Sequence, residues 1–268
     1  MTTLAILGAG KMGEALLSGL LRSGTPAGDI VVTTRRDDRG KLLEERYGVN
    51  AVETSDASSR AETLVIAVKP QDMAALLTEL TSSVTTDNLM VSVAAGIPTA
   101  FIEKRLADGV PVVRVMSNTP VLVDEAMSAI SAGRHATELH LQRAEDLLRH
   151  VGKVLRVPES QQDAVTALSG SGPAYFFYLV EAMIDAGILL GLPRTVAADL
   201  LVQTAIGSAV MLRDTGEHPV KLREAVTSPG GTTISAVYEL EKHGVRAALI
   251  SAIEAARDRS RELADGHD

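Results

Sequence analysis

The chain has no cysteine and no tryptophan, and only 3% of its 268 residues are aromatic. Without cysteine, disulfides, thiolate catalysis and cysteine-based zinc sites are all excluded. A cysteine-free chain also suits the reducing environment of the cytosol. The scarcity of aromatic side chains argues against a platform on which nucleic-acid bases would stack.

Basic residues are outnumbered. The 26 lysines and arginines stand against 34 aspartates and glutamates, which gives a net charge of −8. Nucleic-acid binding as the main activity and docking on anionic lipid both require a basic surface, so this balance argues against each. The first ten residues, MTTLAILGAG, lack the basic start of a signal peptide. We therefore expect a cytoplasmic protein.

An uncharged hydrophobic run long enough to cross a membrane is also missing. The longest apolar stretch, residues 173–192, contains Glu181 and Asp185, which favours a buried helix over a membrane span. Hydrophobic residues nevertheless make up 46% of the chain. The length therefore suits one large domain or two ordinary ones, each with a sizeable core.

The first half of the chain alternates short β-branched runs with helical stretches. The expected strands span residues 3–7, 30–34, 63–68, 88–94, 111–116, 126–131 and 153–157. The expected helices span residues 11–23, 38–47, 71–81, 98–107 and 136–150. Most of these strands are continuous apolar runs, which is typical of a parallel sheet covered on both faces. The alternation predicts an α/β fold with a Rossmann-like doubly wound sheet.

The pattern changes after Pro158, from which point only helices are expected. They fit residues 160–168, 173–190, 194–213, 217–226, 233–242 and 244–264. A domain boundary is therefore expected near residues 157–159, giving a first domain at 1–158 and an all-helical domain at 159–268. Two of these helices are apolar nearly all round and must be buried. A monomeric bundle is one interpretation, but we favour an obligate dimer, since an isolated domain would expose a large apolar patch.

Residues 8–13 read GAGKMG, directly after an expected strand and at the start of an expected helix. In this G-x-G-x-x-G pattern Gly8 permits the tight turn, Gly10 lets the backbone approach a pyrophosphate, and Gly13 lets the helix pack closely on the strand. The helix N-terminus then favours phosphate. The alternative is a glycine-rich turn with a structural role alone.

The end of the second expected strand selects the cofactor. A protein that prefers NAD usually places an acid there to hold the ribose 2′-hydroxyl, whereas this chain has Thr33, Thr34, Arg35 and Arg36. Hydroxyl and guanidinium groups suit a 2′-phosphate, which favours NADPH, with NADH as the second choice. The alternative is that the two arginines form a solvated surface pair.

Two further strand ends carry residues suited to a ligand. Lys69 and Pro70 follow the strand at 63–68, and the strand at 88–94 leads into Ala95 and Gly96. Ligands of open α/β sheets bind at the carboxyl ends of the strands. Lys69 is therefore a candidate contact, and the small residues allow close approach of a nicotinamide ring. A surface lysine at a helix start and ordinary turn residues are the alternatives.

Two later segments rich in glycine and hydroxyl side chains open helices. They are LSGSGPAY at 168–175 and TSPGGTTI at 227–234. Such helix starts bind anions, and a substrate carboxylate is the obvious candidate; helix capping is the alternative. The six histidines show no metal-ligand spacing, and no G-x-S-x-G motif is present, so neither a metal site nor that hydrolase class is expected.

In chain order, these segments resemble those of pyrroline-5-carboxylate reductases. The matching segments are GAGKMG, AVKPQ, SVAAGI, RVMSNTP (114–120), LSGSGPAY, GLP (191–193), HP (218–219) and VTSPGGTTI (226–234). The resemblance implies a Rossmann-like domain joined to an all-α dimerisation domain, in an interlocked homodimer that often assembles into a decamer. It also implies NAD(P)H-dependent reduction of Δ1-pyrroline-5-carboxylate to L-proline.

The resemblance further implies roles for residues that match the family's motifs. The expected cofactor-binding residues include the three glycines of the G-x-G-x-x-G motif. They are Gly8, Ala9, Gly10, Lys11, Met12, Gly13, Thr33, Thr34, Arg35, Arg36, Val68, Lys69, Pro70, Ala95, Gly96 and Asn118. The expected substrate-binding residues are Gly231, Thr232 and Thr233, with Ser171 nearby. Thr233 is the candidate catalytic residue, either as a donor to the ring nitrogen or as a holder of the carboxylate.

Two rival functions stay open on the sequence alone. β-Hydroxyacid dehydrogenases are similar in architecture but carry a lysine acid/base in the long helix, where this chain reads Pro-Ala-Tyr-Phe at 173–176. That absence counts against alcohol oxidation, whereas a protonated cyclic imine needs orientation more than acid–base groups. A non-catalytic nucleotide-sensing dimer is the second rival. Related imines such as piperideine-2-carboxylate also stay open.

Overall fold

The computed structural model describes residues 4–265, so residue 3 of the first expected strand and His267 lie outside the described residues. The chain divides into two compact units. Unit 1 takes the residues up to Ser171 and those from Ala256 onward, and unit 2 comprises Gly172–Ala255. The division into domains at 1–158 and 159–268 stays a prediction.

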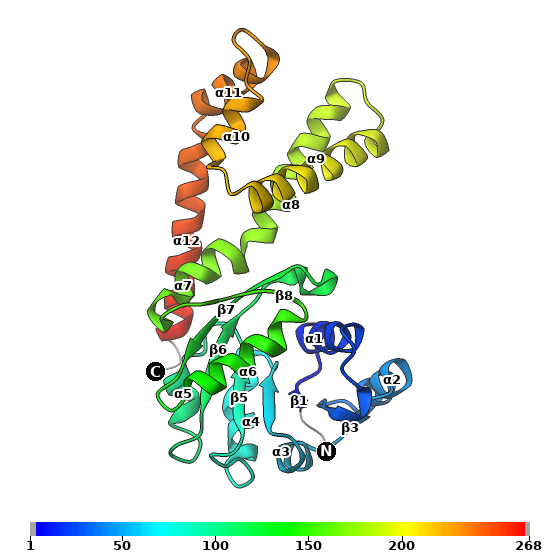
Figure 1. Cartoon of the computed structure of the whole chain (residues 1–268), viewed down its shortest axis with the longest axis vertical. Coiled ribbons are helices and arrows are strands. Elements are labelled where there is room, and N and C mark those ends of the chain that lie inside the picture. The colour runs from blue at the N-terminus through cyan, green and yellow to red at the C-terminus, as the bar shows by residue number, and fades with distance from the viewer. Residues whose placement is uncertain (1–3, 266–268) are drawn as a thin grey trace. The chain divides into compact units, whose positions relative to one another are not determined.

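Unit 1 contains an eight-stranded sheet (Figure 1). Its strands are β1 (Leu4–Leu7), β2 (Ile30–Thr33), β3 (Asn50–Ala51), β4 (Thr63–Ile66), β5 (Leu89–Ser92), β6 (Val112–Met116), β7 (Ala126–Ala132) and β8 (Gly152–Arg156). Their order is β3-β2-β1-β4-β5-β6-β7-β8, and all neighbours are parallel except β6 and β7. Because the order reverses beside β1, the crevice at its carboxyl end is the usual ligand position of such a sheet.

Helices cover both faces of the sheet. They are α1 (Lys11–Arg22), α2 (Asp37–Tyr47), α3 (Thr54–Arg60), α4 (Met73–Leu80), α5 (Thr99–Glu103), α6 (Glu138–Arg149) and α7 (Gln162–Val165). Strand β1 shows the arrangement: Leu4 and Ile6 belong to a core cluster with residues of α1, α2 and α6, and Ala5 and Leu7 to one with α3, α4 and α5. The predicted sheet is confirmed, with both faces buried at β1, β2, β4, β5 and β6, whereas the edge strands β3 and β8 are partly exposed.

Strand β3 and helix α3 were not predicted. Strand β3 has only two residues, and helix α3 reads TSDASSR, which lacks an apolar period. The helix is nevertheless fixed on the sheet, because Ala57 is fully buried in the core cluster with α4 and α5. The helix also buries Ser58, whose hydroxyl donates to Ser83 at 2.7 Å, so tertiary contacts outweigh a polar sequence here.

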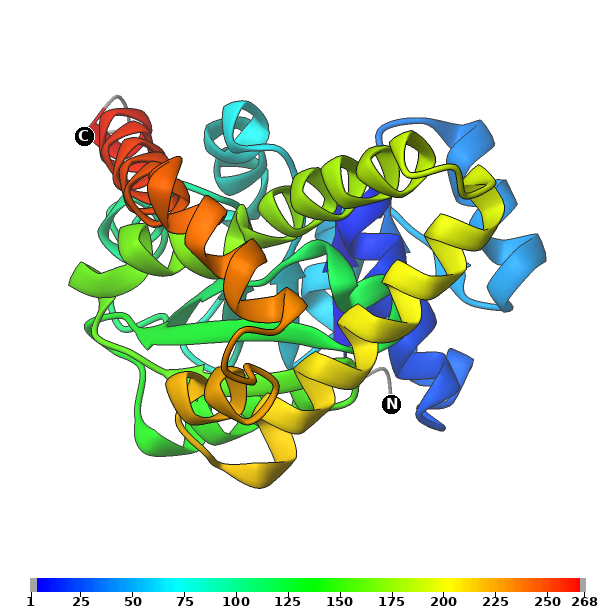
Figure 2. The same cartoon turned by 90° about the horizontal axis from the view of Figure 1, so that it is seen from above.

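Unit 2 is made of helices. They are α8 (Gly172–Leu189), α9 (Arg194–Thr215), α10 (Pro219–Ala225), α11 (Thr232–Lys242) and the first half of α12 (Val245–Asp265). Helices α8 and α9 contact each other near the loop that joins them and diverge away from it (Figure 2). They lie close together at Gly187, where an added Cβ would lie 2.9 Å from the Cβ of Ala197, so a larger side chain would force a local shift of the helices.

The apolar surface of unit 2 is largely uncovered in the single chain. Helix α8 has no buried residue, and Ala197 is the buried residue of α9. Tyr178 is 72% exposed and Leu189 is 88% exposed. The segments Glu159–Leu189 and Arg194–Thr215 are long and apolar enough to cross a membrane by length and composition. Such a surface requires a covering partner of some kind.

Candidate active site

The glycine-rich turn after β1 is held against the end of β2. The backbone N–H of Gly8 donates to the carbonyl oxygen and the hydroxyl of Thr33, both at 3.2 Å, and the N–H of Ala9 donates to the same carbonyl at 3.0 Å. Gly8 has φ +90°, which a side chain would strain. Thr33 is thus tied to the turn by both its backbone and its hydroxyl.

The three glycines of the fingerprint have different surroundings. A Cβ on Gly8 would lie 2.6 Å from Val68 Cγ1 and 3.0 Å from the Val68 nitrogen. A Cβ on Gly13 would lie 2.7 Å from the Gly8 oxygen and 3.2 Å from Ile6 Cγ2, so helix α1 packs closely on the strand. A Cβ on Gly10 would meet nothing within 4 Å. Open space therefore lies in front of Gly10.

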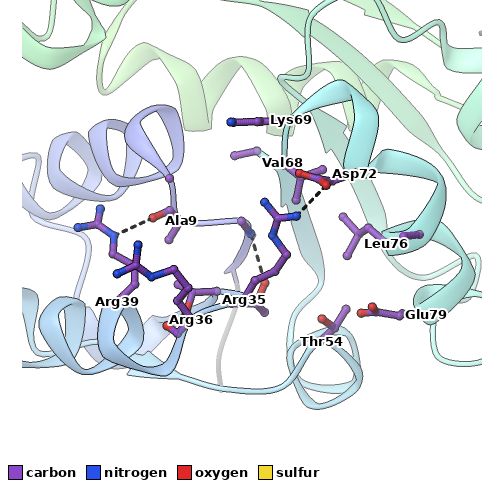
Figure 3. Close-up of a pocket in the computed structure, with 16 residues that line it drawn as sticks. Ala9, Arg35, Arg36, Arg39, Thr54, Val68, Lys69, Asp72, Leu76 and Glu79 are labelled. Carbon is purple, nitrogen blue, oxygen red and sulfur yellow. Dashed lines mark hydrogen bonds and ion pairs between the residues drawn. The ribbon is translucent and has the colours of Figure 1, made fainter.

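A pocket of about 320 Å³ opens beside this turn (Figure 3). Nine of the expected cofactor-binding residues line it: Gly8, Ala9, Gly10, Thr33, Thr34, Arg35, Arg36, Val68 and Lys69. The structure therefore brings together residues from the ends of β1, β2 and β4. That gathering follows from the sheet order, in which β2 and β4 are the two neighbours of β1.

Three arginines stand at the pocket, each with an acidic partner. Arg35 donates from Nη1 to Asp72 Oδ1 at 2.7 Å, and both side chains lie on the pocket wall (Figure 3). Arg36 is paired with Asp38, and its hydrogen bond lowers the pKa of that carboxyl. Both residues of this second pair are strongly exposed, so solvent screens their attraction.

The third arginine, Arg39, is held by Glu14 of α1 and donates from Nε to the carbonyl of Ala9 at 3.3 Å. Burial by itself would raise the pKa of Glu14. The hydrogen bonds from Arg39 and Tyr47 and the charges of Arg39 and Arg46 outweigh burial, and the pKa lies below its ordinary value. The ionised carboxylate keeps the Arg39 guanidinium beside the glycine turn.

Some pocket residues were missed by the sequence analysis. They are Arg39, Thr54, Ala67, Asp72, Ala75, Leu76 and Glu79. Arg39 lies in the first turn of α2, three residues after Arg36, and that spacing on a helix start could have identified it. Thr54 begins α3 shortly after β3, and Asp72 ends the 3₁₀ helix that follows β4, so a search of the segment after every strand would have included them.

Other expected cofactor residues lie outside this pocket. Lys11, Met12 and Gly13 form the first turn of α1, and Pro70 begins the short 3₁₀ helix Pro70–Asp72. Ala95 is exposed and Gly96 has φ +74°. No observation tests the role of these residues toward a cofactor, which stays a prediction.

Asn118 is engaged within unit 1. Its Nδ2 donates to the carbonyl of Ser169 at 3.2 Å, and its Oδ1 accepts from the N–H of Met127 at 2.9 Å. Ser169 belongs to the π-helical turn Thr166–Gly170, in which the N–H of Ser171 bonds to the carbonyl of Thr166 at 2.8 Å. Single π-turns are frequent at functional sites, and this one places Ser171 at its end.

Glu159, which the sequence analysis did not assign, anchors the loop that carries Ala95 and Gly96. Its carboxylate accepts from the N–H of Thr99 at 2.8 Å and the Thr99 hydroxyl at 2.6 Å. It also pairs at 3.2 Å with the buried guanidinium of Arg114. The start of α5, directly after the loop, is therefore fixed to the sheet through β6.

The expected substrate residues lie in both units. Gly231 is the N-cap of α11, Thr232 and Thr233 are its first two helical residues, and Ser171 is the last residue of the first segment of unit 1. Among the described residues, no side chain caps α11, so Thr233 is not its cap. The first backbone N–H groups of this helix are free to receive an anion.

Comparison with known proteins decides the family. Residues 159–263 match the family model described as pyrroline-5-carboxylate reductase dimerisation, and residues 3–96 match the model described as NADP oxidoreductase, coenzyme F420-dependent. A pyrroline-5-carboxylate reductase from Corynebacterium melassecola is 45% identical over 267 residues, which is 98% of this chain and 99% of that protein. The chain belongs to the pyrroline-5-carboxylate reductase family.

Further members of the pyrroline-5-carboxylate reductase family agree along the whole chain. The Arabidopsis thaliana reductase is 43% identical and covers 96% of this chain and 94% of its own length. The Coxiella burnetii structure has a TM-score of 0.92 at 36% identity, with 98% of both chains covered. The Plasmodium falciparum structure, solved with NADP bound, has a TM-score of 0.88 at 26% identity and the same coverage. The predicted fold class, a Rossmann-like domain followed by an all-α dimerisation domain, is confirmed.

Within residues 4–265, no group of three or more histidine, aspartate and glutamate side chains is arranged to hold a metal ion.

Proposed function

We propose that this chain reduces Δ1-pyrroline-5-carboxylate to L-proline with NADPH, and that NADH serves as a second cofactor. The observation that carries the proposal is the pocket at the glycine turn, walled by arginines, in a chain that belongs to the pyrroline-5-carboxylate reductase family. The NADP bound to the Plasmodium falciparum relative supports the same cofactor class.

The pocket fits a dinucleotide on three counts. The space in front of Gly10 is open, so a pyrophosphate can approach its backbone. The N-terminus of α1 follows directly and favours phosphate. Arg35 and Arg36 stand where a 2′-phosphate is expected, with Thr33 and Thr34 beside them. When bound, the cofactor supplies the hydride that reduces the carbon of the C=N bond.

The residues proposed to bind the substrate hold and orient it. The free N–H groups at Thr232 and Thr233 hold the carboxylate, and the Thr233 hydroxyl hydrogen-bonds either the ring nitrogen or the carboxylate. A protonated cyclic imine is already a strong electrophile, so the residues orient it and exclude water. Ser171, at the end of the π-helical turn, is a further proposed substrate-binding residue.

We extend the proposal to assembly. A homodimer covers the apolar surface of α8 and α9 with the same surface of a second chain, in keeping with the match to a dimerisation family over 159–263. Assembly of such dimers into a decamer, a cytoplasmic location and the absence of a membrane span follow as parts of the same proposal. In it, the two membrane-length segments are dimer helices.

A spectrophotometric assay tests the function. NADPH or NADH consumption is followed at 340 nm with Δ1-pyrroline-5-carboxylate or piperideine-2-carboxylate as substrate. We expect turnover of the five-membered imine with both cofactors and a higher kcat/KM with NADPH. A protein that binds nucleotide and reduces neither imine would instead be a nucleotide sensor, and oxidation of a β-hydroxy acid would identify the dehydrogenase alternative.

The double substitution of Arg35 and Arg36 by alanine is expected to raise the KM for NADPH about tenfold, because a lost charge-assisted bond to phosphate costs on the order of 1.5 kcal/mol. The KM for NADH should change much less, since its ribose carries a neutral hydroxyl. Steady-state kinetics with both cofactors measure the difference. Equal effects on both would reject the 2′-phosphate role.

Thr233→Ala is expected to lower kcat/KM for the imine by about tenfold, the value of one lost bond to a charged group. A rise in KM alone indicates a carboxylate contact made equally in ground and transition states. A fall in kcat indicates a bond to the reacting nitrogen, which changes charge during reduction. The KM for NADPH should stay nearly constant. Wild-type kcat/KM in this variant would remove Thr233 from the site.

A further inference from the structure

The ion pair of Arg35 and Asp72 crosses the pocket. Arg35 follows β2, whereas Asp72 ends the 3₁₀ helix Pro70–Asp72 after β4, and β1 lies between these strands in the sheet. The two side chains extend toward each other across the crevice and meet at 2.7 Å (Figure 3). By contrast, Arg36 and its partner Asp38 are two residues apart in the chain, so that pair does not join the two walls.

The two partners differ in exposure. The Arg35 side chain is 77% exposed, whereas that of Asp72 is 24% exposed. Asp72 immediately precedes α4, but it does not cap that helix with its side chain, and its carboxylate points to Arg35 instead. A carboxylate that is three-quarters buried depends strongly on a compensating charge. The exposed guanidinium can change partners at a smaller cost.

We propose that Asp72 is a specificity-determining residue that competes with the 2′-phosphate of NADPH for Arg35, and so keeps NADH usable. The inference rests on the proposed function, because it assumes that a dinucleotide occupies this pocket. A 2′-phosphate that binds Arg35 leaves Asp72 without its partner and beside a second anion. The neutral 2′-hydroxyl of NADH leaves the ion pair intact.

The position of the acid differs from that in a protein that prefers NAD, and this difference explains how Asp72 competes with the 2′-phosphate. A protein that prefers NAD usually carries an acid at the end of β2, where it accepts a bond from the ribose hydroxyl. Here that strand end carries Arg35, and an acid stands on the facing wall after β4. Asp72 therefore lowers the preference for NADPH through Arg35, although residues 33–36, at and after the end of β2, have the composition expected of an NADPH site.

The test compares two nucleotide fragments that differ at the 2′ position. Adenosine 2′,5′-bisphosphate and 5′-AMP are titrated by calorimetry into the intact wild-type protein and the isosteric variant Asp72→Asn. We expect the variant to bind the bisphosphate about five times more tightly, as the removal of one partly exposed ion pair and one like-charge contact allows. Its affinity for 5′-AMP should change by less than about twofold.

Glu79→Gln is the matched control. Glu79 also lines the pocket and is exposed, and it has no ion pair with Arg35 among the described residues. Its substitution removes the same charge from the same wall, and we expect it to change the ratio of the two affinities by less than about twofold. Thermal melts establish that both variants are folded.

The double variant Arg35→Ala with Asp72→Asn, compared with Arg35→Ala alone, completes a double-mutant cycle. If Asp72 acts through Arg35, its substitution should leave the affinity for the bisphosphate unchanged once Arg35 is absent. The inference is overturned if Asp72→Asn weakens the bisphosphate, tightens both nucleotides equally, or has the same effect without Arg35. Weakening would show that Asp72 positions Arg35 for the phosphate instead.

The outcome is separable from the proposed function. The wild-type protein is assayed at 340 nm with Δ1-pyrroline-5-carboxylate and each cofactor alongside the titrations. A wild type that binds both fragments but reduces no imine contradicts the proposed function and leaves the competition standing. An active wild type whose Asp72→Asn variant shows unchanged fragment affinities overturns the competition alone.

Discussion

Gly10→Val is expected to weaken NADPH binding by about a hundredfold, close to 2.7 kcal/mol, while the protein keeps its fold. Gly10 has φ −75° and ψ −157°, an extended conformation with negative φ, so its backbone is not in the left-handed region that requires glycine. A Cβ there meets nothing within 4 Å, so the first added carbon displaces no protein group. The added side chain instead fills the space through which a pyrophosphate reaches the backbone.

Gly8→Val is the informative contrast. Its Cβ would lie 2.6 Å from a Val68 methyl and 3.0 Å from the Val68 nitrogen, at a φ of +90°. This variant should therefore lose both NADPH binding and stability, with backbone strain alone costing about 1–3 kcal/mol. Thermal unfolding and NADPH fluorescence titration measure the two effects separately. If Gly10→Val retained wild-type NADPH affinity, the pyrophosphate would have to lie elsewhere.

Ile206→Asp is expected to prevent formation of a folded dimer. Ile206 lies on α9 and is 53% exposed in the single chain, in a unit whose long helices bury almost no residue of their own. If dimerisation covers this surface, an unpaired carboxylate is trapped in an apolar interface, at a cost of several kcal/mol. Because the dimer is then inseparable from folding, unit 2 should unfold or aggregate.

Leu139→Asp provides the control for this substitution. Leu139 is 59% exposed on α6 of unit 1, and the same change there should leave the mass and helicity of the protein unaltered. Light scattering and circular dichroism at low micromolar concentration measure both variants and the wild type. A stable, active wild-type monomer of 28.2 kDa would refute the obligate dimer.

The parts of the fold that were predictable from the sequence are those determined locally. Apolar runs located the long strands of the sheet. The spacing of Gly8, Gly10 and Gly13 between an expected strand and an expected helix located the turn after β1, since these signals are all adjacent in the sequence. Helix α3 was not predictable in this way. Its sequence is polar, and its position depends on the burial of Ala57 against distant elements.

In the candidate site too, residues marked by local sequence could be predicted, whereas contacts between distant segments could not. Arg35 was assigned because it ends a recognisable strand, but its partner Asp72 lies 37 residues later, and their meeting depends on sheet order. Glu159 was missed for the same reason, since its bond to Thr99 spans 60 residues. The role of Thr233 also stays a prediction, because it depends on the substrate and on how the chain is assembled.

Unit 1 is discontinuous in the sequence, and this has a consequence for the order of folding during synthesis. The hydroxyl of Ser260, in the last turns of α12, donates to Asp163 at 2.8 Å across 97 residues. A nascent chain that has released the whole sheet still lacks this segment until unit 2 has also left the ribosome. We infer that α7 waits uncovered through the synthesis of unit 2, and that the nucleotide-binding unit is completed only after unit 2 has been made.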